Sequence, residues 1–407
     1  MKPATFDLVI AGGGLTGASL ACAAASLGRR VAVLESFAIG DDQQPSFDER
    51  TIALTFASRR VLEGLGVWRD IDAEACPIES IHISDRGHFG TARLDRSHAG
   101  TAALGYVVPT RALGAALTRR MQRFENLEFY CPATAESVEQ FTDRVEVRGT
   151  NDIHLSAPLL ALADGGRSGL GARCGLELET RRYPKVALVA IVGLDRSHEN
   201  RAFERFTKHG PLALLPMTGQ RMALAWTLPE VRARQLASAP ADEFLAALQR
   251  TFGDRCGAFT RVGSRQTYPL SLGRLAKPFR GRVLAVGNAA HVVHPVAGQG
   301  FNLGLRDVAE LADHLATCWR VNLDIGGADG LRRYARERRA QTRNVSVFTD
   351  GLIGLFTSPA PIVTAARGIG LNVVDVLPPA KRFFLRRTMG LQGRLPRLAR
   401  GLAPDGE

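Results

Sequence analysis

Three glycines near the N-terminus have the spacing of a phosphate-binding turn. The pattern Gly12-x-Gly14-x-x-Gly17 directly follows the apolar run 6–11, which has the length of a β-strand. Glycine allows a tight turn and lets backbone N–H groups approach a pyrophosphate at the N-terminus of the following helix. The pattern therefore predicts a site for the phosphates of a nucleotide cofactor.

The segments around this turn complete a βαβ unit. The small residues 18–27 predict the helix, and residues 30–34 predict a second strand that ends at Glu35. A carboxylate at that position can accept hydrogen bonds from ribose hydroxyls. We therefore predict dinucleotide binding rather than a glycine-rich turn in an ordinary α/β domain. The unit alone does not distinguish NAD from FAD.

Two later apolar segments also end in turns. Residues 158–163 lead into Asp164-Gly165, and residues 282–286 lead into Gly287-Asn288. An Asp-Gly pair after a strand is a turn in its own right. After the second turn, the block that ends at Asp307 should open a helix that continues to about residue 319.

These three motifs together resemble those of the class A flavoprotein hydroxylases, which share the fold of p-hydroxybenzoate hydroxylase. Within that class, the chain resembles the ubiquinone-biosynthesis hydroxylases, and specifically the 2-polyprenyl-6-methoxyphenol hydroxylases. The matching segments cover essentially the whole chain: 48–54, 83–88, 201–207, 209–217 and 287–307. The last two segments are specific to this branch.

The resemblance implies FAD as the cofactor and assigns roles by position in the motifs. The glycine turn would hold the pyrophosphate, Glu35 the adenosine ribose, and Asp164 would lie between pyrophosphate and ribityl groups. Arg50 would approach the flavin, where a fixed cation offsets phosphate or reduced-flavin charge. The implied FAD contacts are Gly12, Gly14, Gly17, Glu35, Arg50, Arg111, Asp164, Asn288, Pro295, Gly298, Gln299, Gly300 and Asn302.

Asn288 departs from the pattern of the broad class, which usually has Asp at that position. An Asn can still accept a hydrogen bond from a ribityl hydroxyl, and it removes a negative charge near the flavin. The polyprenyl-methoxyphenol branch often has the same Asn, so the difference supports that branch.

The segment after Asn288 would surround the isoalloxazine ring. Backbone N–H groups at the helix N-terminus there can stabilise the negative charge of the reduced ring. The implied catalytic residues are Pro295, Gly298, Gln299 and His294. A metal site at His291 and His294 would need a third ligand, and none is evident, so we predict no metal. Proton transfer from a substrate phenol is an alternative use of these histidines.

The implied reaction is hydroxylation of the aromatic ring of a polyprenylated methoxyphenol in ubiquinone biosynthesis. NADH or NADPH would reduce FAD, and O2 would form a flavin C4a-hydroperoxide. A related hydroxylase for another ring position or a soluble aromatic acid is the alternative. The Trp-x-Trp-x-Ile-Pro pattern of flavin halogenases is missing, because Trp68, Trp226 and Trp319 lie far apart. A flavin-free lipid escort is disfavoured because the glycine turn and the 295–300 loop are intact.

The middle of the chain predicts a substrate-binding sheet. Short alternating strands are expected between Tyr183 and Tyr268, and such a sheet could supply an apolar wall over the flavin. The resemblance assigns Leu214, Pro216 and Tyr268 to the substrate. Simple core strands are the alternative interpretation for most of these residues.

The predicted fold class is α/β, with a Rossmann-like FAD-binding domain, an inserted mixed β-sheet substrate domain and a C-terminal helical region. The FAD-binding segments are 1–75, 106–180 and 273–345. The substrate segments are 76–105 and 181–272, and residues 346–407 form the helical, basic region.

The composition is that of a globular protein with basic surfaces. The chain has 407 residues and a net charge of +12, which suggests an anionic partner. No nucleic-acid module is apparent. Six scattered cysteines without a Cys-x-x-Cys pair suggest a cytoplasmic protein. The expected partners are the polyprenylated phenol, O2 and other ubiquinone-biosynthesis proteins.

The C-terminal region combines apolar residues with arginines. Apolar residues between 353 and 374 precede basic residues between 381 and 400. A helical cap on the FAD-binding domain is the slightly favoured interpretation of the helices. For the basic tail, we favour peripheral contact with anionic lipid on the inner face of the cytoplasmic membrane.

Overall fold

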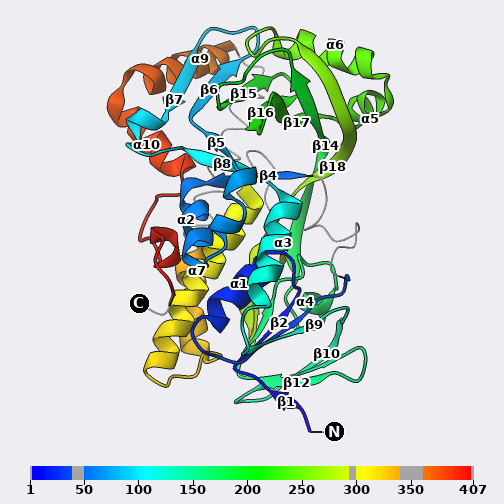
Figure 1. The fold of residues 1–407 in the computed structure, drawn as a ribbon, viewed down its shortest axis with the longest axis vertical. Helices are drawn as coiled ribbons and strands as arrows, with labels where there is room; N and C mark the ends of the chain where they lie inside the picture. Colours follow the sequence, from blue (N-terminus) through cyan, green and yellow to red (C-terminus); the bar gives the residue numbers. More distant parts are fainter. Residues whose placement is uncertain (1, 39–49, 293–298, 340–360, 405–407) are drawn as a thin grey trace.

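The computed structural model describes residues 2–38, 50–292, 299–339 and 361–404. Its elements form two main bodies joined by a small sheet (Figure 1). The observed fold is α/β with several sheets and a helical C-terminal region, which confirms the predicted fold class. The predicted domain limits remain a prediction.

The first body contains a six-stranded sheet of short strands. Its order is β19 (Phe279–Arg280), β20 (Val283–Ala285), β13 (Leu160–Leu162), β2 (Leu8–Ala11), β3 (Val31–Leu34) and β9 (Leu127–Tyr130). All neighbours are parallel except β19 and β20. Parallel strands need both faces covered, which explains their continuous apolar runs.

Helices cover one face of this sheet and a second sheet covers the other. Leu8 and Ile10 share a core with α1 (Leu15–Ala25), α3 (Thr110–Met121) and α7 (Gln299–Arg320). Val9 packs with Val147 in the opposite core. That core contains the four-stranded sheet of β1 (Ala4–Thr5), β12 (His154–Ala157), β11 (Val145–Gly149) and β10 (Ala135–Gln140).

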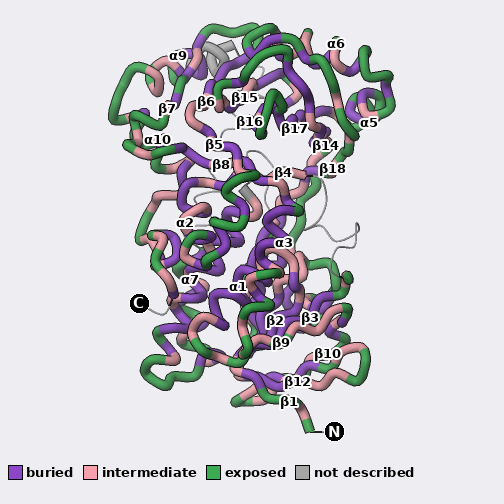
Figure 2. The backbone as a smooth tube through the Cα atoms, viewed as in Figure 1, coloured by how far each residue is buried: buried purple, intermediate pink, exposed green. Residues whose placement is uncertain are grey.

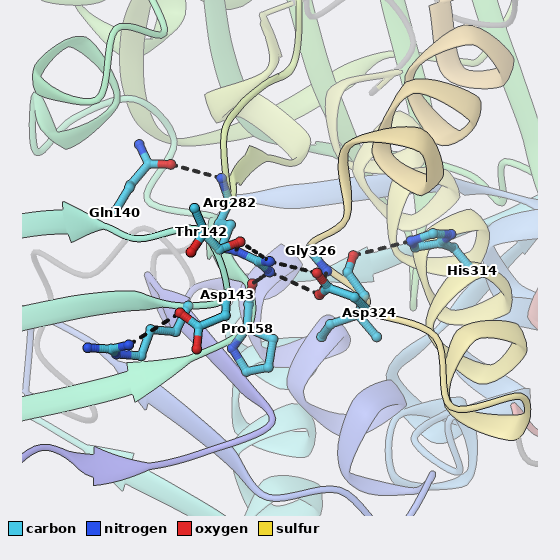
Figure 3. Close-up of polar contacts among 10 residues, drawn as sticks. Gln140, Thr142, Asp143, Pro158, Arg282, His314, Asp324 and Gly326 are labelled. Carbon is cyan, nitrogen blue, oxygen red and sulfur yellow. Dashed lines mark hydrogen bonds and ion pairs between the residues drawn. The ribbon is translucent and has the colours of Figure 1, made fainter.

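One buried arginine ties the edge of the six-stranded sheet to the elements around it (Figure 3). Nε of Arg282 donates to the Thr142 carbonyl at 2.8 Å, and Nη1 donates to the Pro158 carbonyl at 2.9 Å. Both terminal nitrogens also bind the carboxylate of Asp324, at 2.9 and 2.6 Å. The residue therefore joins the start of β20 to the four-stranded sheet and to the loop after α7.

The second body is an eight-stranded mixed sheet. Its order is β21 (His291–Val292), β18 (Phe259–Leu275), β14 (Leu178–Leu194), β17 (Arg221–Pro229), β16 (Gly210–Met217), β15 (Arg201–Thr207), β6 (Ser80–Asp85) and β7 (Thr91–Asp95). Helices α5 (Glu230–Ser238) and α6 (Ala241–Phe252) cover its outer face, and both helices have exposed stretches (Figure 2). Phe244 and Leu248 of α6 are fully buried against the sheet.

The inner face of this sheet is turned toward the first body. Between them lies the three-stranded sheet of β4 (Thr51–Thr55), β8 (Gly105–Pro109) and β5 (Cys76–Ile78), and α2 (Phe56–Gly64) follows β4 directly (Figure 1). Val107 of β8 and Ile78 of β5 share a core with Met217 and Ala223 of the inner face. Because side chains alternate along a strand, each strand of the sheet has one inner and one outer set.

The helices of the C-terminal segment pack in a different place from the one expected. Helices α9 (Pro361–Val376) and α10 (Pro378–Thr388) pack beside β6 and β7 and share a core with Ile83 and Leu94, so they cover the eight-stranded sheet. Of the predicted basic tail, residues 381–388 belong to α10, and Leu398 is fully buried against α2 and α7. The membrane contact of the tail remains a prediction. Among the described residues, no helix has the length and apolar character needed to cross a bilayer.

Candidate flavin site

The glycine turn connects β2 to α1 in the way that its spacing predicts. Gly12 has φ +104°, and a Cβ atom on it would lie 2.6 Å from the backbone nitrogen of Asp164. A Cβ on Gly17 would lie 1.8 Å from the carbonyl oxygen of Gly12. The turn therefore packs directly on the end of β13, and a side chain at either position would push the backbone away.

The N-terminus of α1 is suited to a pyrophosphate. Gly14 is the N-cap residue, and no side chain caps the first turn. The backbone N–H groups of that turn, together with the helix dipole, can bind an anion. Glu35 is buried at the end of β3, and its carboxylate accepts hydrogen bonds from the N–H groups of Gly13 (2.8 Å) and Phe37 (2.9 Å). The geometry thus fits a nucleotide whose ribose lies beside Glu35.

The other two turns meet the glycine turn at the carboxyl ends of the parallel strands. The carboxylate of Asp164 accepts from the N–H of Gly166 at 2.9 Å and from the Ser168 hydroxyl. A Cβ on Gly165 would lie 4.0 Å from Cβ of Asn288. Gly287 has φ +59°, and a Cβ on it would lie 2.9 Å from the Thr16 side chain. Ligands of open α/β sheets bind at this edge.

Asn302 joins the first turn of α7 to β4. Its Oδ1 accepts from the Thr55 N–H at 2.8 Å, and its Nδ2 donates to the Ala53 carbonyl at 2.8 Å. Arg50, just before β4, lies with its guanidinium 5.1 Å from the ring centre of Tyr268. The structure therefore brings one predicted flavin contact and one predicted substrate contact together at the boundary between the two bodies.

A buried ionic cluster that the sequence analysis did not identify supports the Asn288 turn. One carboxylate oxygen of Asp307 accepts from the Gly287 N–H (2.8 Å) and bonds Nε2 of His291 (2.7 Å). The other oxygen accepts from Nε of Arg338 at 2.5 Å. Burial raises the pKa of Asp307, but Arg338, His291 and the Gly287 N–H outweigh burial and lower it to about 2.

The remaining Nδ1 atom of His291 is buried and has no hydrogen-bond partner among the described residues. With Nε2 bonded to a carboxylate, Nδ1 is the atom that can accept a proton or a hydrogen bond in the neutral ring. One feature of the sequence indicated the cluster: Asp307 lies in the helix predicted to follow the Asn288 turn.

Several predicted site residues cannot be placed. Pro295, Gly298 and His294 lie outside the described residues. The backbone of Gln299 begins α7, but the structure does not describe its side chain. Gly300 lies in the first turn of the same helix. Arg111 is exposed at the start of α3.

The structure does not bring Leu214 and Pro216 to the face that carries Tyr268. Leu214 is fully buried in the core beneath α5 and α6, and Pro216 pairs with Met222 of that same core. Tyr268 pairs with Ala187, on the opposite face of the sheet. The inner residue of β16 at this level is Leu215, which is half-buried beside Met217 and Ala223. The strand was predicted correctly, but the inward residue is its neighbour.

Comparison with known proteins agrees with this geometry. A family model described as FAD binding domain matches residues 5–349. Ubiquinone hydroxylase UbiL of Rhodospirillum rubrum is 36% identical over 408 residues, covering 97% of this chain and 93% of the relative. The ubiquinone biosynthesis monooxygenase COQ6, mitochondrial, of Homo sapiens is 26% identical over 430 residues, covering 92% and 91% of the two chains.

Solved structures show the same fold. The p-nitrophenol 4-monooxygenase PnpA from Pseudomonas putida has a TM-score of 0.78 at 19% identity and covers 96% of this chain and 99% of that chain. The probable FAD-dependent monooxygenase pqsL from Pseudomonas aeruginosa has a TM-score of 0.76 at 22% identity, with coverage of 90% and 99%. At these identities the similarity establishes the fold alone.

Proposed function

We propose that this chain, which belongs to the FAD-binding domain family of flavin-dependent monooxygenases, hydroxylates the aromatic ring of a polyprenylated phenol in ubiquinone biosynthesis. The observation that carries the proposal is the meeting of the glycine turn, the Asp164 turn and the Asn288 turn beneath the inner face of the eight-stranded sheet. The names of the relatives support the pathway, and a methoxyphenol ring is the substrate that we favour.

Bound FAD, reduced by NADH or NADPH, would supply the activation of O2. The task of the chain is to hold the cofactor and to place the ring carbon in a dry site. The turn at Gly12 and the N-terminus of α1 would bind the pyrophosphate, and Glu35 would orient the ribose. Asn302 would keep β4, and with it Arg50, at a fixed distance from the first turn of α7.

The inner face of the eight-stranded sheet would form the substrate wall. Ile191 and Leu215 each pair in register with Ala223, which lies between them, so the three residues are neighbours across three strands. Ile191 and Leu215 are only half-buried. An apolar surface on the face that carries Tyr268 suits an aromatic ring with a hydrocarbon chain.

We also propose that the chain contacts an anionic bilayer through α9 and α10. Large apolar side chains are exposed there, among them Val376 (73%) and Phe383 (65%). Arg382 and Arg386 are exposed on the same helix as Phe383. Apolar side chains flanked by arginines suit the headgroup region of such a bilayer. Association with other ubiquinone-biosynthesis proteins is supported by the relatives' names alone.

Anaerobic absorption spectroscopy tests the function. The purified protein should show flavin bands that bleach when NADH or NADPH is added, and faster when a prenylated methoxyphenol is present. Admission of air should then give the hydroxylated phenol. A colourless protein that takes up no added FAD would contradict the proposal. Flavin bands that bleach at the same rate with and without the phenol, and no hydroxylated phenol after air is admitted, would contradict the assignment of the substrate.

Gly17→Ala tests the cofactor site. Its methyl group would meet the Gly12 carbonyl, so we expect the purified variant to lose most of its FAD. Alanine favours helix over glycine, so loss of the helix itself is not the expected cause. Gly370→Ala is the control, because nothing lies within 4 Å of its Cβ position. Circular dichroism should show that both variants fold, and a Gly17→Ala protein with full flavin content would refute the assignment.

A further inference from the structure

An acidic side chain lies on the inner face of the eight-stranded sheet, among apolar residues. Glu204 in β15 pairs with Ala213 of β16 on one side and with Ile83 of β6 on the other. Ala202 and Phe206, two residues before and after it, belong to the cores on the inner face. Because side chains alternate, Glu204 points to that same face.

One oxygen of the Glu204 carboxyl group lacks a partner among the residues that the structure describes. Its Oε1 atom is buried and makes no hydrogen bond within the described part of the chain. Burial raises the pKa of Glu204 to about 7. A buried, unsatisfied carboxyl group destabilises a fold, so its presence on a ligand-facing surface suggests a ligand that supplies the missing bond.

The charged groups nearest in register are already paired with one another. Asp85 lies two residues beyond Ile83 on the same face of β6, and it binds Arg367 of α9 and His88. On the other side, the inner face of β16 carries the uncharged residues Ala213, Leu215 and Met217. Among the described residues, no cation faces Glu204 closely enough to hold it ionised, so its titration depends on burial.

A short series of contacts links this position to the cofactor site. Ile83 and Phe206, the register and strand neighbours of Glu204, pack in one core with Phe56. Phe56 directly follows Thr55, whose N–H binds Asn302 in the first turn of α7. Glu204 therefore lies on the wall that faces the helix end predicted to hold the isoalloxazine ring.

We propose that Glu204 binds the phenolic hydroxyl of the substrate and accepts its proton during hydroxylation, an inference that rests on the proposed function. The phenolic O–H bond breaks and an O–H bond forms at the carboxylate, with no change of oxidation state in the pair. A phenol has a pKa of about 10, so it is mostly protonated at neutral pH. The proton becomes acidic when the ring carbon is attacked, and a carboxylate poised near neutral pH is then an efficient acceptor.

The test compares Glu204→Gln with the wild-type holoenzyme. Glutamine keeps the size and one hydrogen bond but cannot take up the proton. The wild-type rate of hydroxylation of a prenylated methoxyphenol should rise with pH through about 7. In the variant this rise should vanish, the kcat should fall on the order of 100-fold, and KM should change little. Less product and more hydrogen peroxide should form per NAD(P)H consumed.

A ligand-free measurement keeps the inference testable if activity is lost for another reason. A carboxyl group whose pKa is raised by folding stabilises the protein less as pH rises from its unfolded value through about 7. Glu204→Gln should therefore match the wild type at acidic pH and melt at a higher temperature at pH above this value. Glu139→Gln, an exposed position on β10, is the matched control and should alter neither property.

The outcomes separate the two proposals. A wild-type enzyme that hydroxylates no prenylated phenol overturns the proposed function, and this inference with it. A wild-type enzyme that does so, with a Glu204→Gln variant of the same pH profile and the same product yield, overturns the role of Glu204 alone. An unchanged pH profile of melting in Glu204→Gln would show that the carboxyl group is not buried as described.

Discussion

Asp307 holds three groups of the flavin site together at the scale of single residues. It joins the Gly287 N–H, the His291 ring and the Arg338 guanidinium, which come from three separate elements. Both Asp307 and Arg338 are almost fully buried. A buried pair of this kind is costly to break on one side only, because the other charge stays desolvated.

Asp307→Asn should therefore destabilise the fold by roughly 3–5 kcal/mol at neutral pH. Folding lowers the pKa of Asp307 to about 2. Its contribution to the free energy of unfolding is therefore fully present above the pKa of the unfolded chain, and it is lost as the pH falls toward about 2. Urea denaturation across this range should show the gap between wild type and variant closing in acid. Asp329→Asn removes an exposed partner of Arg332 and should change little. A gap that does not depend on pH would contradict the prediction.

Residues with strictly local constraints were predictable from the sequence. A Cβ at Gly12 or Gly17 meets backbone only a few residues away or at the adjacent strand end, so spacing alone identified the turn. Leu214 shows the opposite case. Alternation defines two faces of β16, but which face is covered by α5 and α6 depends on packing with distant segments. Asp307 was missed because its partner Arg338 lies 31 residues further along the chain.

At the scale of elements, the strands of the cofactor unit were predicted to within a few residues. The predicted strand 30–34 appears as β3, and the helix predicted to end near residue 319 ends at Arg320. Short strands buried on both faces are recognisable because their sequences are continuously apolar. Arg282 directly precedes the strand β20, near the edge of the six-stranded sheet (Figure 3). A substitution of this arginine therefore tests whether its contacts hold β20 in place.

Arg282→Met should destabilise the protein by roughly 3 kcal/mol, at the low end for a buried ion pair because Asp324 is exposed and can be hydrated. The variant keeps the aliphatic stem but leaves the carbonyls of Thr142 and Pro158 without their donor. Arg201→Met removes an exposed pair with Glu199 and should lower the free energy of unfolding by less than about 1 kcal/mol. Equal losses in the two variants would show that the contacts of Arg282 do not stabilise this edge.

At the scale of the whole molecule, the C-terminal helices lie on the side of the eight-stranded sheet, away from the six-stranded sheet (Figure 1). The sequence predicted apolar helices followed by a basic tail, but it did not predict that the end of the tail packs on a different part of the molecule from the helices. The end of the tail, residues 398–400, packs against α2 and α7, whereas the exposed apolar residues belong to α9 and α10 and the exposed Arg382 and Arg386 belong to α10. The polyprenylated substrate that we propose, together with these exposed apolar residues, makes this side the one that should meet a bilayer.

Exchange of Arg382 and Arg386 for Gln should therefore weaken binding to phosphatidylglycerol-containing vesicles. Each arginine near an anionic surface contributes about 1 kcal/mol, so the double variant should bind on the order of 30-fold more weakly in a flotation assay. The matched control exchanges Arg333 and Arg336, which are exposed on another helix, for the same loss of charge. Binding that falls equally in both variants would indicate only a response to net charge. Binding that falls in the α10 variant alone, and further with Phe383→Ser, would place the membrane contact on this surface.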